Sequence, residues 1–535
     1  MELKNKILEF FKNIKLNKKK RNIITYSILI IFILLIVLTC YLSKQNSVQE
    51  FDVSVESIDV NTYTDSTIKK DDVKNNIDCK YYAYIILESV IVSGTIMYLI
   101  MSKNNEYKFK KTFINTDKVI IYTDSVILLS VAISLLSFEL VGIMPDRKIE
   151  DKKMNYSYAS IIKNSIDKKG DVYTTGELSK NALLITGKNS VNLNNVTVQK
   201  SGNSKSINGN NSGLLINDNA SVTIKDSSIS TTSTDSEAIY IDGGKKYNSD
   251  TNILLNNSYI KTDSNNSIGI NNNNSYVKLE STGIESILEN SPLIVNNGKT
   301  TIKNGYYTTS AIGSPFALNK GELSLNKANI QVFDSDLIRL INNGKITINK
   351  SNLASVHRTV NDDTGYPKCI FIYGENKKSK SEFTMKNSNL LILNGDTFFV
   401  TNTKATINLY SSTIFNTSDT SLFMRIQSNI FVDKNNNGGE VELNLDKQKI
   451  GGYIAIDEYS EIRIVAENKS ELEVSINPDD QGKYASLYLD KTSKLTLLAD
   501  TYLNDFTNKD KTNKNINLNG HKLYINGVSL NIKSK

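Results

Sequence analysis

Several residue types on which enzymes rely are scarce in this 535-residue chain. There is no tryptophan, and the only two histidines, His357 and His521, lie far apart in the sequence. A histidine-based catalytic triad or zinc site is therefore poorly supported. The three cysteines form no CxxC pair and predict neither a disulfide framework nor a metal centre. No glycine-rich phosphate loop is evident, so we predict no cofactor.

Strong charge of one sign is also lacking. The formal net charge is only +7, and lysine is spread along the chain rather than gathered with aromatic residues in a basic patch. This distribution argues against a nucleic acid as partner. The sequence also lacks an LPxTG-like sorting signal, so we expect any anchor to be an apolar segment of the chain.

The chain instead contains a repeat, seen first in residues 213–231, GLLINDNASVTIKDSSIST. Short apolar runs alternate with clusters of Asn, Asp, Ser and Gly, a pattern typical of short strands joined by tight turns. One apolar position recurs in steps of 24, 23, 23 and 23 residues, at Leu255, Leu279, Ile302, Leu325 and Ile348. This step predicts a parallel β-helix, in which stacked coils bury one continuous core. The alternatives are an Asn-rich disordered tract, which would not keep this register, and a sandwich of short hairpins.

Three apolar segments in the amino-terminal third predict membrane spans, at about 23–42, 81–101 and 119–144. Residues 1–21 contain eight Lys and Arg. The loop at 102–118 is richer in lysine for its length than the loop at 44–80. By the positive-inside rule the amino terminus is cytoplasmic, and everything after residue 144 is extracellular. Glu88 and Glu139 fall at matching depths within the second and third spans, where a carboxylate is costly unless it lies near the headgroups.

The remaining residues divide into a connector and the solenoid. We expect residues 145–177 to form a stalk followed by a short helix, because Tyr158, Ile162 and Ile166 recur every four residues. This helix would cap the solenoid or serve only as a linker. The solenoid itself is predicted over residues 178–535. Extra residues interrupt its repeat at 203–211, 245–251, 357–367 and 375–382, and such insertions map to loops, often on a binding face.

The repeats at 222–229 and 346–353, with the closing NINLNGHKLYINGVSL, resemble bacterial right-handed parallel β-helix surface proteins. These are the adhesin-like and pectate-lyase-like solenoids of low-GC Gram-positive bacteria. The resemblance covers roughly residues 170–535 and implies a mainly β fold. It says little about function, because that fold carries lyases, hydrolases, adhesins and phage spikes.

Candidate chemistry is sparse. A β-helix glycosidase needs two carboxylates that flank a sugar, and two acidic clusters are candidates, although both also fit solvated turns. The first holds Asp334 and Asp336 with Arg339; the second holds Asp362 and Asp363 with His357 and Arg358. The aromatic candidates are Tyr306, Tyr307, Tyr366, Phe371 and Tyr373. These rings could stack on sugars or inside the coil core.

The function that these features favour is a membrane-anchored, non-catalytic surface protein that binds an extracellular glycan or a host or matrix protein, as an adhesin does. The alternatives are a polysaccharide lyase or glycoside hydrolase, and a sensor or export-associated membrane protein. We expect a binding patch where the inserts at 357–367 and 375–382 project near one face. Its residues are His357, Arg358, Asp362, Asp363, Tyr366, Lys377, Lys378 and Lys380.

Overall fold

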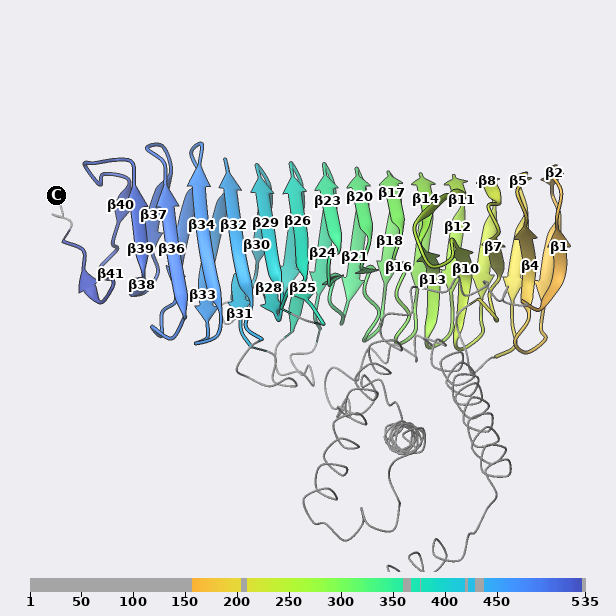
Figure 1. The fold of residues 1–535 in the computed structure, drawn as a ribbon, viewed down its shortest axis with the longest axis horizontal. Helices are drawn as coiled ribbons and strands as arrows, with labels where there is room; N and C mark the ends of the chain where they lie inside the picture. Colours follow the sequence, from red (N-terminus) through yellow and green to blue (C-terminus); the bar gives the residue numbers. More distant parts are fainter. Residues whose placement is uncertain are drawn as a thin grey trace, which may run out of the picture. The chain divides into compact units, whose positions relative to one another are not determined.

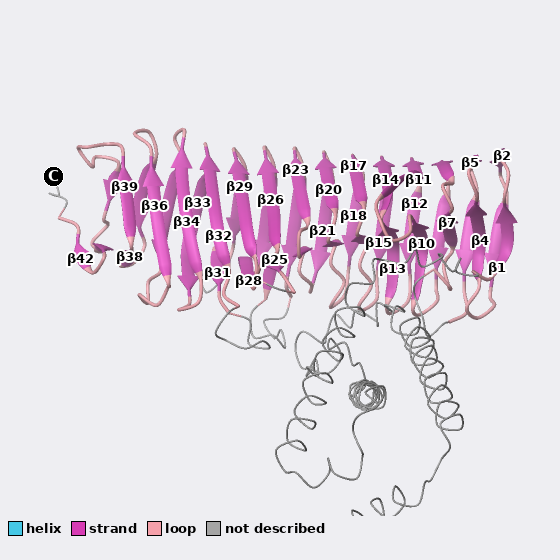
Figure 2. Cartoon of the chain, in the orientation of Figure 1, coloured by secondary structure: helices cyan, strands magenta, loops and turns pink. Residues whose placement is uncertain are grey.

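The computed structural model describes residues 156–203, 209–358, 367–375, 377–418, 422–428 and 437–531. In these ranges the chain consists of strands and turns, without an α-helix (Figures 1 and 2). None of the described residues belongs to a helix long and apolar enough to cross a membrane. The three predicted spans, with Glu88 and Glu139, lie outside the described residues.

Three long sheets, here called A, B and C, run side by side along the chain. Sheet A consists of β1 (Tyr158–Ile162), β4 (Asn181–Thr186), β7 (Leu214–Asn217), β10 (Ser236–Asp242), β13 (Ser267–Asn273), β16 (Ile294–Asn296), β19 (Ala317–Asn319), β22 (Ile338–Ile341), β25 (Lys368–Tyr373), β28 (Asp396–Thr401), β31 (Met424–Ile426), β33 (Lys449–Ile456), β35 (Glu471–Ile476), β37 (Lys494–Leu497) and β40 (Ile516–Asn517).

Sheet B consists of β2 (Ile166–Lys169), β5 (Ser190–Asn194), β8 (Ser221–Lys225), β11 (Asn248–Asn256), β14 (Ser275–Glu280), β17 (Lys299–Lys303), β20 (Glu322–Asn326), β23 (Lys345–Asn349), β26 (Lys380–Lys386), β29 (Lys404–Tyr410), β32 (Glu440–Asp446), β34 (Glu461–Glu467), β36 (Tyr484–Leu489) and β39 (Asp505–Asn508). Sheet C consists of β3 (Val172–Thr175), β6 (Thr197–Lys200), β9 (Ser228–Thr231), β12 (Tyr259–Thr262), β15 (Gly283–Ser286), β18 (Tyr306–Thr309), β21 (Asn329–Phe333), β24 (Asn352–Val356), β27 (Asn389–Leu393) and β30 (Thr413–Asn416).

From β1 to β29, each strand pairs in parallel with the strand three places further along the chain. One coil therefore contributes one strand to each sheet, which is the arrangement of a parallel β-helix and confirms the predicted mainly β repeat fold. The predicted register is also confirmed. Leu279 pairs with Ile302, and Leu325 pairs with both Ile302 and Ile348. All four side chains are buried in the continuous core.

The corner between sheets B and C is the most regular part of the coil. Each of the ten connections from sheet B to sheet C has two residues. The first of the two always has positive φ, a conformation that Asn, Asp and Gly tolerate best. These residues are Gly170, Asn195, Asp226, Asn257, Ser281, Asn304, Lys327, Lys350, Asn387 and Ser411. The second residue often stacks its hydroxyl onto the next coil, as where the Ser351 amide donates to Ser388 Oγ at 3.1 Å.

A ladder of buried asparagines lines the corner between sheets A and B. Asn272 Nδ2 donates to Asn296 Oδ1 at 2.9 Å, and Asn296 Nδ2 donates to Asn319 Oδ1 at 2.7 Å. Each amide also bonds backbone carbonyls of its own or the next coil. The ladder thus satisfies buried polar groups at a corner where the backbone leaves the sheet.

The predicted helix near residues 156–168 is wrong, and the coils begin earlier than residue 178. Residues 158–162 form β1 and residues 166–169 form β2, which pair with β4 and β5. Backbone pairing with the second coil overrides the local spacing. Ile162 is buried, whereas Tyr158 and Ile166 are exposed, so these residues do not share one buried face. The recurrence every four residues spans a corner of the coil.

The carboxyl-terminal coils lose the third sheet. After β30 the chain passes from sheet B directly to sheet A, as between β32 and β33. The chain ends in a small sheet of β38 (Thr501–Leu503), β41 (Leu523–Ile525) and β42 (Val528–Ser529). Asn526 and Gly527 both have positive φ and join β41 to β42 as an antiparallel hairpin. An Asn-Gly pair is the residue combination that such two-residue turns favour.

Candidate functional site

All four inserts border sheet A. Residues 203–211 and 357–367 fall between a sheet C strand and a sheet A strand. Residues 245–251 and 375–382 run from the connection between sheet A and sheet B into the first residues of β11 and β26. The last two inserts named for binding, 357–367 and 375–382, adjoin the same strand, β25, at its two ends. By contrast, the B-to-C corner accepts no insertion in any of its ten coils. Sheet A is therefore the face where the chain departs most from its repeat.

Two residues of the predicted patch, His357 and Arg358, make contacts within the solenoid. His357 is buried, and its Nε2 lies 3.3 Å from the Lys368 carbonyl oxygen. The Arg358 amide donates to Asp334 Oδ1 at 2.7 Å, and its Nε donates to Asp334 Oδ2 at 2.6 Å. The structure thus joins the two acidic clusters of the sequence across one coil. Asp334 holds Arg358 in place, and Arg358 also lies over the Phe333 ring.

The rest of the predicted patch is only partly described. Asp362, Asp363 and Tyr366 lie outside the described residues. Lys377 is half-buried, while Lys378 and Lys380 are exposed at the start of β26. The patch as a whole remains a prediction.

Asp336 is buried and paired with cations on the outer side of sheet A. Arg339 Nε donates to Asp336 Oδ2 at 2.5 Å, and Lys368 Nζ lies 3.8 Å from Asp336 Oδ1. Asp334 and Asp336 are thus each paired with Arg. Lys368 also lies over the rings of Phe371 and Phe399. The cluster is a packed ionic and aromatic unit in which each ion pair offsets the cost of burying its charges.

The candidate aromatic residues divide between the core and the surface. Tyr307 is buried in the core, edge-on to Phe316 at 5.5 Å. Phe371 and Tyr373 stack at 4.5 Å and are buried on sheet A. Tyr306 is 53% exposed. Only Tyr306 of the described candidates therefore presents a ring to solvent.

Tyr306 has a counterpart that the sequence did not reveal. Tyr259 pairs with Gly283, and Gly283 pairs with Tyr306, so two outward tyrosines flank a glycine on sheet C. A Cβ at Gly283 would lie 2.9 Å from Tyr259 Cδ2, so the glycine makes room for the Tyr259 ring. The two rings stand two coils apart, about 10 Å along the stack. Tyr259 is 43% exposed, and the pair forms an open aromatic surface.

Polar partners hold both rings. The Tyr259 hydroxyl donates to the Glu285 carboxylate, and the Tyr306 hydroxyl donates to Gln331 Oε1 at 3.1 Å. Partial burial and the bond to Glu285 raise the pKa of Tyr259 to about 12. The phenol therefore stays protonated at neutral pH. Because each ring leans onto the next coil, its face is fixed rather than free to rotate.

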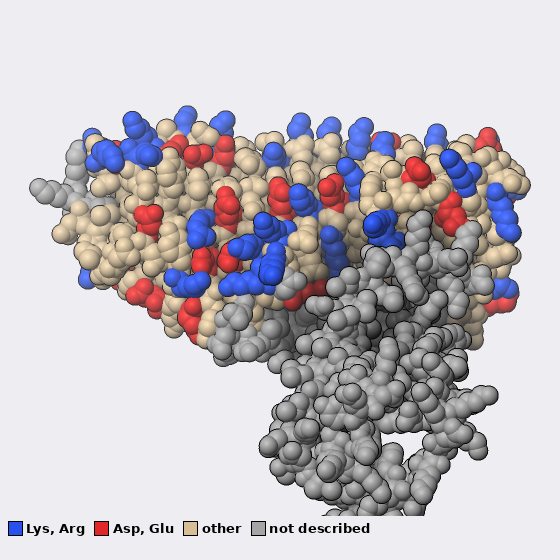
Figure 3. Space-filling model, in the orientation of Figure 1, with Lys and Arg blue, Asp and Glu red and all other residues tan. Residues whose placement is uncertain are grey.

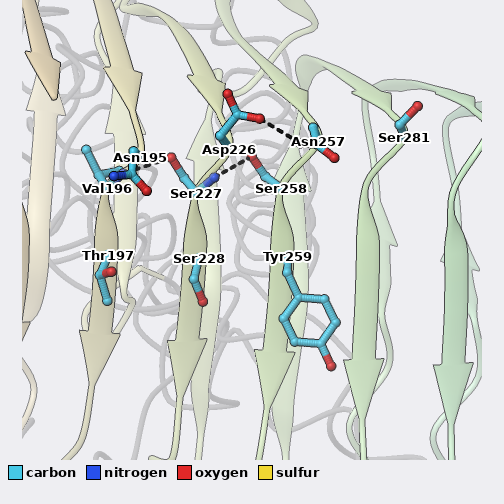
Figure 4. Close-up of a pocket in the computed structure, with 10 residues that line it drawn as sticks. All are labelled: Asn195, Val196, Thr197, Asp226, Ser227, Ser228, Asn257, Ser258, Tyr259 and Ser281. Carbon is cyan, nitrogen blue, oxygen red and sulfur yellow. Dashed lines mark hydrogen bonds between the residues drawn. The ribbon is translucent and has the colours of Figure 1, made fainter. Parts of the chain in front are cut away.

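An open groove of about 420 Å3 runs beside Tyr259 along the corner between sheets B and C (Figure 4). Most of the residues that line it are polar. Asn257 Nδ2 donates to Asp226 Oδ1 at 2.6 Å, and the Ser227 amide donates to Ser258 Oγ at 3.2 Å. A polar, open groove of this kind suits a hydrated ligand better than an apolar one.

Lysines follow the same corner in the middle of the stack. Basic side chains recur along the edge at the top of Figure 3, to which the sheet B strands of Figure 1 point. In four successive coils a lysine lies in this corner or directly before it, at Lys303, Lys327, Lys350 and Lys386. The corner residues beside them are Asn, Gly, Ala and Ser. Glu280, on the preceding coil, pairs with Lys303. The corner borders Tyr306, the first residue of β18.

Sequence reasoning missed this surface because it depends on register. Tyr259 and Tyr306 lie 47 positions apart in the sequence and become neighbours only when three coils are stacked. The one available signal was that each begins a sheet C strand directly after a two-residue corner. Comparison of the chain with protein-family models, curated proteins and solved structures found no match.

Proposed function

We propose that the chain is a membrane-anchored surface protein whose right-handed solenoid binds an anionic glycan on the outer face of sheet C. The observation that carries this proposal is the pair of exposed tyrosines, Tyr259 and Tyr306, each hydrogen-bonded to the next coil, near a polar groove and a row of lysines. Aromatic rings present an apolar face to a sugar ring, and the two hydroxyl oxygens, which already donate to Glu285 and Gln331, can still accept hydrogen bonds. Lysines at the border attract carboxylate or sulfate groups.

The repeat allows such a binding surface to extend over several coils. Stacked coils place equivalent side chains about 4.8 Å apart along a straight line. A polymeric ligand lying along the stack would contact several coils in the same way. Three exposed apolar side chains, Leu391, Leu393 and Phe415, continue the outer face of sheet C toward its last coil.

Binding is tested with the full-length protein in detergent, using polygalacturonate as the anionic probe and its methyl-esterified form as the neutral one. We expect salt-sensitive binding to polygalacturonate only. Tyr306→Ala should weaken it by about two- to tenfold, equivalent to about 0.5–1.5 kcal/mol. Tyr247→Ala is the matched control, because Tyr247 is equally exposed but lies between sheets A and B.

Equal loss of binding in both variants would remove sheet C from the proposal. Binding of the two glycan forms with equal affinity would remove the anionic specificity. The anchor and topology are tested separately, by adding protease to intact cells. Degradation of the solenoid with residues 1–21 spared is the expected result, and a protected solenoid would contradict an extracellular location.

A further inference from the structure

The outward side of sheet A is apolar and buried along most of its length. In each strand the middle residue points away from the core, as the period of two requires. Phe371, for example, lies between Ile370 and Ile372, which are both in the core. Nine successive outward residues pair from coil to coil and are at most 9% exposed: Leu184, Leu215, Tyr240, Asn271, Val295, Leu318, Arg339, Phe371 and Phe399.

Outward positions of a solenoid normally face water and are polar. The nine residues from Leu184 to Phe399 in this pairing line, here called the sheet A column, contain only two polar side chains. The other seven fall into two hydrophobic clusters separate from the main core. Burying each large apolar side chain is worth roughly 1.5–3 kcal/mol. Their burial calls for a segment that covers this face.

The described chain already shows where that cover begins. Tyr156, which precedes β1, is buried against Leu184, Leu215 and Tyr240. Its hydroxyl donates to Asp242 Oδ2 at 2.8 Å, on the strand three coils further along the stack. The first described residue of the chain therefore lies on the outer face of sheet A.

We propose that residues 51–63, FDVSVESIDVNTY, bind along the sheet A column. Phe51, Val53 and Val55 alternate with polar residues, as a strand covering one apolar face requires. The alternation then shifts by one residue and continues at Ile58 and Val60. The proposal rests on the proposed topology, which puts the loop at 44–80 on the same side of the membrane as the solenoid.

Length and composition single out this segment. Thirteen extended residues reach about 43 Å. The column runs over eight strand spacings, about 38 Å. The stretch at 145–155, PDRKIEDKKMN, also leads to this face, but seven of its eleven residues are charged, which makes it a poor cover for Leu318 and Phe371. Residues 51–63 carry three acids and no base, so their polar side can face water.

The test uses thiol labelling of the full-length protein in intact cells. Cys40 and Cys79 are changed to Ser, and Cys369 is kept because it is buried in the core. Single reporters Leu318→Cys and Ser324→Cys lie in the same coil, on the outer sides of sheets A and B. An impermeant maleimide should label Leu318→Cys more than about tenfold more slowly than Ser324→Cys.

The segment is then perturbed. Val53→Asp with Val55→Asp should remove the protection of Leu318→Cys, whereas Ser54→Asp with Ser57→Asp, in the same segment, should leave it. Equal labelling of the two reporters would overturn the proposal, as would protection that survives the first pair of changes. Disulfide-linked dimers of Leu318→Cys would overturn it in favour of a second copy. A topology failure is distinguishable, because Ser324→Cys would then label only after permeabilisation.

Discussion

The outer faces of sheets A and C belong to the same coils, yet they differ in almost every property. On sheet A the outward line contains Leu318, Phe371 and Phe399, all buried. On sheet C the equivalent line reads Lys261, Glu285, Thr308 and Gln331 through the middle of the stack. Inserts border sheet A, whereas the B-to-C corner has none.

The difference teaches that the repeat fixes only the inward positions. Inward Ile, Leu and Val are required by stacking in every coil, so they recur on all three sheets. Outward positions are free of that requirement, so their residue types reflect what each face contacts. A buried, apolar outer face indicates a permanent interface, and an open face with tyrosines and lysines indicates a reversible one.

The largest expected effect comes from three changes within one coil. Leu325 points into the core, Leu318 points outward on sheet A and Ser324 points outward on sheet B. Leu325→Asp and Leu318→Asp should each lower the free energy of unfolding by several kcal/mol, because each buries an unpaired charge. Ser324→Asp should change it by no more than about 0.5 kcal/mol.

Denaturant unfolding followed by circular dichroism would give the three values. If Leu318→Asp behaves like Ser324→Asp, the outer face of sheet A is an ordinary wet surface. If Leu325→Asp is harmless, the assigned register itself is wrong.

The next effect compares one residue type on the two faces. Phe371 is buried on sheet A, whereas Phe415 on sheet C is 59% exposed. Phe371→Ala should lower the free energy of unfolding by about 3–5 kcal/mol. Phe415→Ala should cost about 0.5 kcal/mol or less. Melting temperatures of the two purified variants would show the contrast, and equal shifts would abolish the distinction between the faces.

A pH-dependent effect is expected from Glu237, which lies beside the sheet A column. Its carboxylate accepts hydrogen bonds from Ser212 Oγ at 3.0 Å and from Asn271 Nδ2 at 3.3 Å. Complete burial nevertheless raises the pKa of Glu237 to about 7, from 4.5 in the unfolded chain. Below about pH 4.5 Glu237 is protonated in both the folded and the unfolded state, so it does not change the free energy of unfolding. As pH rises from 4.5 to 7 only the unfolded state gives up its proton, so stability falls, by about 3 kcal/mol in all.

Glu237→Gln should remove this fall. The stability of the variant relative to the native protein should therefore rise between pH 4.5 and 7 and stay constant above pH 7. The control is Glu322→Gln, an exposed position on sheet B. Unfolding curves at pH 4, 6 and 8 would measure both. Parallel pH profiles for native protein and Glu237→Gln would mean that Glu237 is not buried.

The smallest effect concerns the lysines at the border of sheet C. Lys327 and Lys350 have φ of 58° and 49° at a corner where asparagine stands in other coils. Lys327→Asn should therefore stabilise the solenoid by about 0.5 kcal/mol, because asparagine tolerates this conformation better. The same change should weaken binding of polygalacturonate. Stabilisation without loss of binding would separate the lysine row from the binding surface.

The sequence predicted the inner architecture because stacking leaves a direct trace in it. The alternation around Leu325 and Ile348 set the register of sheet B, and asparagines marked the corners. The sequence also contains a pattern that indicates the sheet A column. Strands such as Leu214–Asn217 and Lys368–Tyr373 contain three apolar residues in a row, as strands buried on both faces do.

Other features could not be read from the sequence because they depend on contacts between coils. The pairing of Asp334 with Arg358 joins residues 24 positions apart, and the Tyr259–Tyr306 surface joins three coils. The helix expected near Tyr158 and Ile162 failed for the same reason. Local spacing suggested a helix face, but backbone pairing with β4 decided the structure.

Hydroxyl-radical footprinting of the full-length protein, read by mass spectrometry, tests the contrast between the two faces most directly, because it needs no substitution. The account predicts that Tyr259, Tyr306 and Phe415 on sheet C are oxidised rapidly. It predicts that Phe371 and Phe399 on sheet A are protected about as well as Tyr307 in the core. Oxidation of Phe371 and Phe399 at the rate of Phe415 would contradict it.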